Sequence, residues 1–252
     1  MNPEQTQVLD SYPRSRPLLP QRQRDVYERE YAINRASTGL LYRGVHRLEH
    51  WMHRKIAADR PAAAILELGA GGLNHIVVEH EWDRYDIVEP VEAVPAMFPQ
   101  YAQVGRHFVT YDEFVAAAAA GKLEYDKILS VAVLEHLEEL PMVVAASAVT
   151  LNVGGRFHAG IPVEGGLAWE TAWRCSTGVA YRLRTGVSYV PMMNHEHINS
   201  AHDIEHVVSY FFNDVGRKRF PTRLKHISLY EHLVASQPNL DRCRGYLKDN
   251  GI

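Results

Sequence analysis

Apolar positions near the start of the chain recur at helical spacing only after residue 24. Residues 1–24 have few apolar side chains, and Pro13, Pro17 and Pro20 interrupt any periodic pattern, which predicts a flexible arm. From Val26 to Ile56, apolar residues recur roughly every three or four positions between arginine, glutamate and histidine. This pattern predicts two helices that separate near Ser37–Gly39. We therefore expect residues 25–60 to form a helical cover.

A different rhythm begins at residue 61, where short apolar runs end at glycine or acidic residues and alternate with helical stretches. The runs predict buried strands at Ala63–Leu68, Tyr85–Glu89, His107–Thr110, Tyr125–Val131 and Gly155–Ile161. The helical stretches are Val91–Tyr101, Glu113–Ala120 and Leu140–Leu151. Strands that alternate with helices are typical of a parallel sheet with helices on both faces. The pattern therefore predicts an α/β domain over residues 61–252.

The alternation stops after the fifth strand. Residues 163–199 carry two tryptophans and two tyrosines among several glycines, which is too aromatic for a linker. We expect this segment to form a lid, or substrate segment, over the carboxyl edge of the sheet. Ser200 has the pattern of a helix cap and precedes an amphipathic stretch, which predicts one more helix. Two closing strands are expected at Lys218–Phe220 and His226–Tyr230.

Composition narrows the range of partners. The chain has 252 residues, 46% of them hydrophobic, and a formal net charge of −3, so it can fill a core and lacks a global field for nucleic acid. No apolar run approaches the roughly 20 residues of a membrane span. The two cysteines lie far apart and the N-terminus lacks the pattern of a signal peptide, so we expect a cytoplasmic protein. We therefore expect a small-molecule partner, with no nucleic acid and no membrane, and the sequence is compatible with a homodimer.

The glycine-rich turn after the first expected strand carries the most information about ligands. Gly69–Gly72 lacks large side chains, so a ligand can lie against the backbone at the carboxyl end of the strand. Glu89 ends the next strand about 18 residues after Gly71, where its carboxylate can accept both hydroxyls of a ribose. Asn74 occupies the third-glycine position of a dinucleotide site, and Glu67 suits a cationic ligand better than a pyrophosphate.

Motifs in this region resemble those of class I S-adenosylmethionine-dependent methyltransferases of the small-molecule type. They are E-L-G-A-G at Glu67–Gly71, the acidic Glu89, Asp112 after the third strand, Tyr125–Leu137, and N-V-G-G-R-F at Asn152–Phe157. The resemblance covers about Ala62–Ile161. It implies a Rossmann-like three-layer sandwich whose seven-stranded sheet is mostly parallel, with an antiparallel last strand. It also implies S-adenosylmethionine as the cofactor.

The resemblance assigns cofactor contacts along the carboxyl edge of the sheet. It places Glu67 at the amino group, Glu89 at the ribose, and the segment after the fourth strand beside the sulfonium. The complete expected set is Glu67, Gly69, Ala70, Gly71, Glu89, Pro90, Tyr111, Asp112, Val131, Ala132 and Leu134. Glu89 ending a surface strand and Asp112 capping a helix at Glu113 are the alternatives. Only about a dozen residues separate Gly72 from Tyr85, so the first crossover helix should be short.

Histidine is abundant, with 14 residues, and suits the chemistry of methyl transfer. The displacement is in line, and a hydroxyl nucleophile must also lose its proton, which a group with a pKa of ~6.5 can accept. The candidates are His136 after the fourth strand and His195 and His197 in N-H-E-H-I-N-S. Glu164, in the loop after the fifth strand, is a further candidate. Structural histidines and a solvated carboxylate are the alternatives.

Two patterns leave a metal open, although we expect none. His202–His206 matches the inverted zinc-protease pattern H-x-x-E-H, and His195–His197 could hold a divalent ion beside a hydroxyl acceptor. The leading hypothesis is a methyltransferase that acts on a small polar molecule, such as a hydroxyl of a sugar, glycan precursor or secondary metabolite. The alternatives are a nucleotide-dependent oxidoreductase or epimerase on a Rossmann-like sheet, and a methyltransferase-like scaffold that binds without turnover.

Overall fold

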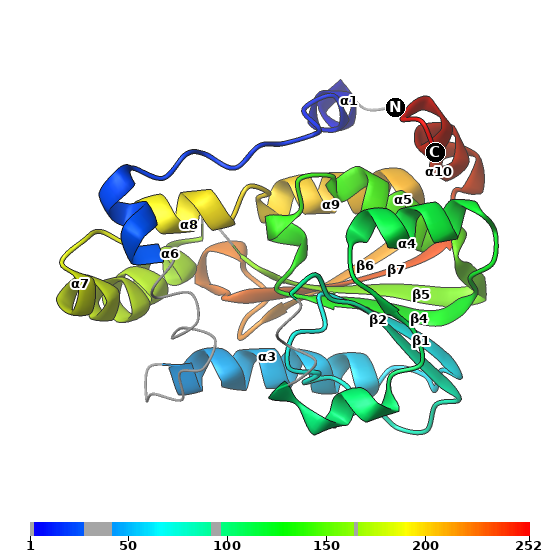
Figure 1. Cartoon of the computed structure of the whole chain (residues 1–252), viewed down its shortest axis with the longest axis horizontal. Coiled ribbons are helices and arrows are strands. Elements are labelled where there is room, and N and C mark those ends of the chain that lie inside the picture. Colours follow the sequence, from blue (N-terminus) through cyan, green and yellow to red (C-terminus); the bar gives the residue numbers. More distant parts are fainter. Residues whose placement is uncertain (1–2, 28–41, 92–96, 164–165) are drawn as a thin grey trace.

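The computed structural model describes residues 3–27, 42–91, 97–163 and 166–252, and it shows helices on both faces of one central sheet (Figure 1). The strands are β1 (Ala64–Leu68), β2 (Arg84–Val88), β3 (His107–Phe108), β4 (Tyr125–Val131), β5 (Leu151–Pro162), β6 (Phe212–Phe220) and β7 (Tyr230–Pro238). Their order across the sheet is β3-β2-β1-β4-β5-β7-β6. β1 to β5 pair in parallel, and β7 runs antiparallel to both β5 and β6. The expected seven-stranded, mostly parallel sheet with an antiparallel last strand is confirmed.

The two faces of the sheet bury different helices because successive side chains of a strand point to opposite sides. Leu66 of β1 belongs to the core shared with α4 (Tyr111–Ala119), α5 (Leu140–Val149), α9 (Ala201–Phe211) and α10 (Leu240–Asp249). Ile65 belongs to the core on the opposite face, beside Met52 of α3 (Tyr42–Ala57). Order along the sheet reverses between β1 and β4, and such a switch point opens a crevice at the carboxyl ends of the strands.

The connections around β2 and β3 differ from the expected ones. Residues 71–78, all of them described, form turns, so the first crossover contains no helix. Within the expected helix Val91–Tyr101, residues 92–96 lie outside the described part, and Pro99–Gln103 is a 3-10 helix, η2. The third strand is shorter than expected because Thr110 leaves the sheet to cap α4, its side chain accepting the N–H of Glu113 at 3.0 Å.

In the second half of the sheet, the bounds of three parts differ from the expected ones. α5 ends at Val149 and β5 begins at Leu151, so the helix is shorter than the expected Leu140–Leu151 and the strand begins earlier than the expected Gly155. The expected strand His226–Tyr230 is wrong, because residues 225–227 form a 3-10 turn and β7 begins only at Tyr230. The expected run at residues 218–220 is the end of the longer β6. The helix at Ser200 is confirmed as α9, with a complete capping box between Ser200 and Asp203.

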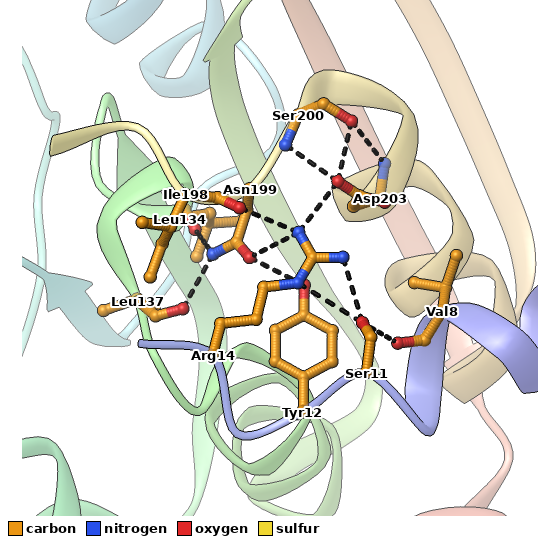
Figure 2. Close-up of polar contacts among 10 residues, drawn as sticks. All are labelled: Val8, Ser11, Tyr12, Arg14, Leu134, Leu137, Ile198, Asn199, Ser200 and Asp203. Carbon is orange, nitrogen blue, oxygen red and sulfur yellow. Dashed lines mark hydrogen bonds and ion pairs between the residues drawn. The ribbon is translucent and has the colours of Figure 1, made fainter. Parts of the chain in front are cut away.

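The N-terminal arm has regular structure and contacts with the rest of the chain in its described part. It contains α1 (Pro3–Leu9) and a helical stretch at residues 21–27. Between them, Tyr12 donates a hydrogen bond to Asn199 Oδ1 at 2.8 Å, and Arg14 forms an ion pair with Asp203 at 2.9 Å (Figure 2). The arm therefore lies along α9, far from it in sequence. The expected helical cover, residues 25–60, consists mainly of residues 28–41, which lie outside the described part, and of α3.

The aromatic segment after β5 is mostly helical. It contains α6 (Leu167–Trp173), a π-helical turn at Arg174–Gly178, α7 (Val179–Thr185) and α8 (Val190–Glu196). Tyr181, Val187 and Met192 of this segment form a small core with Leu19 of the arm and with Val26, at the start of the expected cover. The arm and this segment therefore pack on each other beside the carboxyl edge of the sheet (Figure 1). Among the described helices, none is both long and apolar enough to cross a membrane.

Candidate active site

A cavity of about 550 Å³ opens at the carboxyl ends of β1, β2 and β4. Nine of the expected cofactor residues line this cavity: Glu67, Gly69, Ala70, Gly71, Glu89, Pro90, Tyr111, Val131 and Ala132. They come from elements far apart in sequence that parallel pairing brings to one edge of the sheet. The sequence-predicted turn, the acidic residue after β2 and the segment after β4 therefore lie around one hollow.

The glycine turn has a backbone that a larger residue would disturb. Gly69 has φ +65°, and a Cβ there would lie 2.4 Å from Cγ2 of Val133. The hydroxyl of Tyr101 in η2 donates to the carbonyl oxygen of Gly71 at 2.7 Å, and the Gln100 side chain donates to the carbonyl of Gly72 at 3.0 Å. These two hydrogen bonds fix the conformation of the turn at the edge of the cavity.

Glu89 links this turn to the end of β2. Its Oε2 accepts the backbone N–H of Gly71 at 2.7 Å, and its Oε1 accepts the N–H of Val91 at 2.9 Å. The residue is only 4% exposed. A buried carboxylate held by two backbone donors is fixed in position while its remaining lone pairs can still accept hydrogen bonds. The alternative of a carboxylate at a surface strand end is therefore not what the geometry shows.

Glu67 places a second carboxyl group in the cavity wall. It is buried, and Tyr85 donates a hydrogen bond to its Oε2 at 2.6 Å. Burial raises the pKa of Glu67 to about 8; the Tyr85 hydrogen bond opposes this rise and the charge of Glu89 adds to it. Among the described residues, no lysine, arginine or histidine forms an ion pair with Glu67. Such a group favours a cationic ligand, which would stabilise its ionised form.

Two expected cofactor residues do not line the cavity. Asp112 is exposed on α4 and faces a separate hollow beside Glu139 and Met142. It does not cap a helix at Glu113 either, because α4 begins earlier and Thr110 is its cap. Leu134 is fully buried in the core below the cavity. Neighbouring residues of both, Tyr111 and Val133, supply the lining instead.

His136 is the candidate base that lies in the cavity wall. It ends the 3-10 turn η3 (Leu134–His136), and its Nδ1 lies 2.7 Å from the carbonyl oxygen of Glu196. A carbonyl oxygen can only accept, so Nδ1 carries the proton and Nε2 has the lone pair. Burial, with a smaller contribution from nearby His197, lowers the pKa of His136 to about 4. The imidazole is therefore neutral at neutral pH.

The other three candidates have different surroundings. The ring of His197 meets that of His136 edge to face at 4.8 Å and lines a second, smaller hollow of about 110 Å³ with Trp169, Trp173 and Arg174. His195 points to the arm, with its Nδ1 2.7 Å from the carbonyl of Pro17, and does not line either hollow. Glu164 lies outside the described residues.

Several cavity residues were not predicted from the sequence. Arg16 of the arm lies 3.4 Å from Glu196 Oε2 and donates to the carbonyl of His136 at 3.4 Å. Glu196 also accepts a hydrogen bond from Tyr27. His53 reaches the cavity from α3, and burial, with smaller electrostatic contributions from His75 and His50, lowers its pKa to about 3. None of them stands in a motif; only the position of Glu196 between two candidate histidines gave a signal.

Two groups of described side chains are close enough to share a metal ion, with all ligand atoms of each group within 4.8 Å of one another. One is Glu135, His136 and His197 beside the cavity. The other is Glu4, His202 and His206 on the surface of α1 and α9. His195 belongs to neither group, because its Nδ1 lies 2.7 Å from the carbonyl oxygen of Pro17 in the arm.

Comparisons with known proteins give structural matches only. No family model matches the sequence, and no curated protein matches it. The structure of magnesium protoporphyrin IX methyltransferase from Synechocystis with bound SAM is similar at TM-score 0.53 and 12% identity, over 88% of this chain and 100% of that one. A SAM-dependent methyltransferase from Thermotoga maritima, a possible histamine N-methyltransferase, has TM-score 0.53 and 14% identity, over 84% and 99%.

The N-methyltransferase NodS from Bradyrhizobium japonicum, in complex with S-adenosyl-L-homocysteine, is similar at TM-score 0.50 and 13% identity, over 81% of this chain and 91% of that one. At such low identities the matches establish the fold. This chain has the Rossmann-like, seven-stranded fold of class I S-adenosylmethionine-dependent methyltransferases, as the sequence motifs predict.

Proposed function

We propose that the chain is an S-adenosylmethionine-dependent methyltransferase that acts on a small polar acceptor. One observation carries the proposal: the cavity joins a buried carboxyl group, Glu67, to a glycine turn that the carboxylate of Glu89 holds in place. The ammonium of a methionyl group would neutralise Glu67, and the ribose hydroxyls would bond to Glu89. Structural neighbours with bound SAM or SAH support this assignment.

The cofactor supplies an activated methyl group, and the protein must hold the acceptor in line with it and accept a proton. His136 suits the second task, because its Nε2 bears a lone pair and its Nδ1 is anchored to Glu196. We assign the acceptor to the smaller hollow that His197, Trp169 and Trp173 line, next to the ring of His136. Aromatic rings and the guanidinium of Arg174 suit a polar ring, and a hydroxyl of a sugar, glycan precursor or secondary metabolite fits these groups.

Ligand titration separates this proposal from its two alternatives. We expect S-adenosylhomocysteine to bind the purified chain in titration calorimetry and NAD to leave the heat unchanged, because Glu67 would lie beside the anionic pyrophosphate and Asn74 occupies the third-glycine position of a dinucleotide site. Binding of NAD alone would support an oxidoreductase or epimerase and contradict the proposal. Binding of S-adenosylhomocysteine without methyl transfer to any acceptor in a panel of sugars, phenols and amines would support a scaffold.

Affinity for S-adenosylhomocysteine should rise with pH between about 6 and 8, by up to tenfold per pH unit. In the free protein Glu67 is mostly protonated below its pKa of about 8, and the ammonium of the ligand stabilises the ionised carboxylate. Binding therefore releases a proton, and a higher pH makes this release easier. Calorimetry at pH 6, 7 and 8 in buffers of different ionisation enthalpy measures both the affinity and the proton release.

A matched ligand and a matched variant identify the group that titrates. Methylthioadenosine lacks the amino-acid part, so its affinity should stay nearly constant over the same pH range. Glu67→Gln should remove the pH dependence for S-adenosylhomocysteine as well. An equal pH slope for both ligands, or an unchanged slope in Glu67→Gln, would show that the ammonium is not beside Glu67.

A further inference from the structure

Two histidines of α9 and a glutamate of α1 converge on one point of the surface. The Nε2 atoms of His202 and His206 lie 3.1 Å apart. The carboxylate of Glu4 approaches both, with Oε1 3.4 Å from His202 Nε2 and Oε2 4.0 Å from His206 Nε2. The histidines are one helical turn apart, whereas Glu4 comes from the other end of the chain. The fold therefore adds a third potential ligand that the sequence pattern alone lacks.

These separations fit the ligand sphere of a transition-metal ion. Zinc binds imidazole nitrogen at about 2.0–2.1 Å and carboxylate oxygen at about 2.0–2.2 Å, so neighbouring tetrahedral ligands lie roughly 3.3–3.5 Å apart. The nitrogen pair at 3.1 Å and the closer carboxylate contact at 3.4 Å are near this value. We propose that Glu4, His202 and His206 bind a divalent transition-metal ion of the zinc type, which joins α1 to α9.

The site differs from the hydrolase that the pattern H-x-x-E-H suggests. A metalloprotease needs the glutamate of this motif beside the metal as a general base. Here Glu205 lies with β6, where its Oε2 is 3.0 Å from Arg217 and its Oε1 is 3.5 Å from Arg219. Glu205 is therefore paired with two arginines of β6 and does not face the two histidines' site. The metal would have a structural role, as a clasp between two helices.

The clasp lies at one end of the contacts that hold the arm. Arg14 forms its ion pair with Asp203, the residue after His202, and hydrogen-bonds to the carbonyl of Ile198 at 2.8 Å (Figure 2). Two residues further along the arm, Arg16 enters the wall of the cavity. A metal at Glu4 would thus fix the start of the segment that brings Arg16 to the site. This proposal does not depend on which ligand the cavity binds.

Titration of the tag-free, metal-depleted full chain with zinc chloride tests the site. We expect one equivalent of zinc to bind, and cobalt(II) to give the absorption bands of a four-coordinate ion. His206→Ala and Glu4→Gln should each weaken zinc binding at least tenfold. His226→Ala removes an exposed histidine elsewhere and should leave the affinity unchanged. Circular dichroism verifies that each variant is folded.

A second histidine group beside the cavity makes one further variant necessary. His136→Ala should keep full zinc affinity if the ion binds at α1 and α9, and should lose it if the ion binds with Glu135 and His197. Hydrogen exchange of residues 3–16 should slow on addition of zinc in the wild type but not in His206→Ala. Absence of stoichiometric binding, equal affinity of His206→Ala and wild type, or loss of binding in His136→Ala would each overturn the proposal.

Discussion

Replacing Glu79 with alanine should lower the free energy of unfolding by about 3–5 kcal/mol, because it leaves a buried ammonium without its counter-ion. Glu79 Oε2 lies 2.6 Å from Nζ of Lys127 and 2.8 Å from Nε2 of His75. The side chains of Glu79 and Lys127 are each only 1% exposed. Without the carboxylate, the buried ammonium of Lys127 has neither a counter-ion nor contact with solvent. Urea denaturation at pH 7.5 measures the effect.

Exposed Glu81 gives a matched control, since Glu81→Ala removes the same group two residues away and should change the unfolding free energy by less than about 0.5 kcal/mol. Acid adds a second check. Although burial opposes ionisation, the hydrogen bonds from His75 and Lys127 lower the pKa of Glu79 to about 2. Wild-type stability should therefore fall as pH drops from about 4.5 towards 2, and Glu79→Ala should lose less in this range. A Glu79→Ala loss below 1 kcal/mol would show that water reaches the pair.

The surplus of histidine, which suggests catalytic groups in the sequence, has a second explanation in the structure. His53, His75, His158 and His232 are buried on elements that the fold brings together, with His158 and His232 stacked at 5.4 Å. Burial lowers the pKa of each of them, so they are neutral polar side chains of the interior. No motif marks them, because each stands alone in its own segment. Burial cannot be read from single residues in this case.

Strands of the first half of the sheet could be predicted because their signal is local. β1 and β2 are short apolar runs that end at a glycine and at an acidic residue, β4 is another apolar run, and each of the three is buried on both faces. β6 has no such signal: its sequence F-N-D-V-G-R-K-R-F is mostly polar, because it is an edge strand that is paired only with β7. Its length is set by pairing with a partner further along the chain. The boundaries of β6 and β7 were therefore missed.

The residues of the site also fall into two groups, those that a local sequence signal predicts and those that depend on contacts between distant segments. Glu67, Gly69–Gly71 and Glu89 follow consecutive strands of the parallel sheet, so their proximity is implied once the strands are recognised. Arg16 reaches the cavity only through packing of the arm on α8 and α9. The end of α8 at Glu196 separates the two neighbouring histidines, sending His195 to the arm and His197 to His136. Such divergence depends on a helix boundary that the sequence does not define.

Glu89→Ala should weaken binding of S-adenosylhomocysteine by about 1–3 kcal/mol, or roughly 5- to 150-fold, because a buried ribose loses its charged acceptor. The structure adds a second consequence. The Glu89 carboxylate also accepts the N–H groups of Gly71 and Val91, so its removal loosens the glycine turn. Calorimetry measures the affinity, and Glu81→Ala is again the matched control. An unchanged affinity would place the ribose elsewhere.

A modified ligand separates ribose binding from support of the turn. The 2′-deoxy analogue of S-adenosylhomocysteine lacks one hydroxyl, so it should bind the wild type more weakly than the parent ligand. If Glu89 accepts that hydroxyl, the difference between the two ligands should shrink in Glu89→Ala, and the double-mutant cycle gives a coupling energy of at least about 0.5 kcal/mol. If Glu89 only supports Gly71 and Val91, the variant weakens both ligands equally and the coupling is zero. Only the first result assigns the ribose to Glu89.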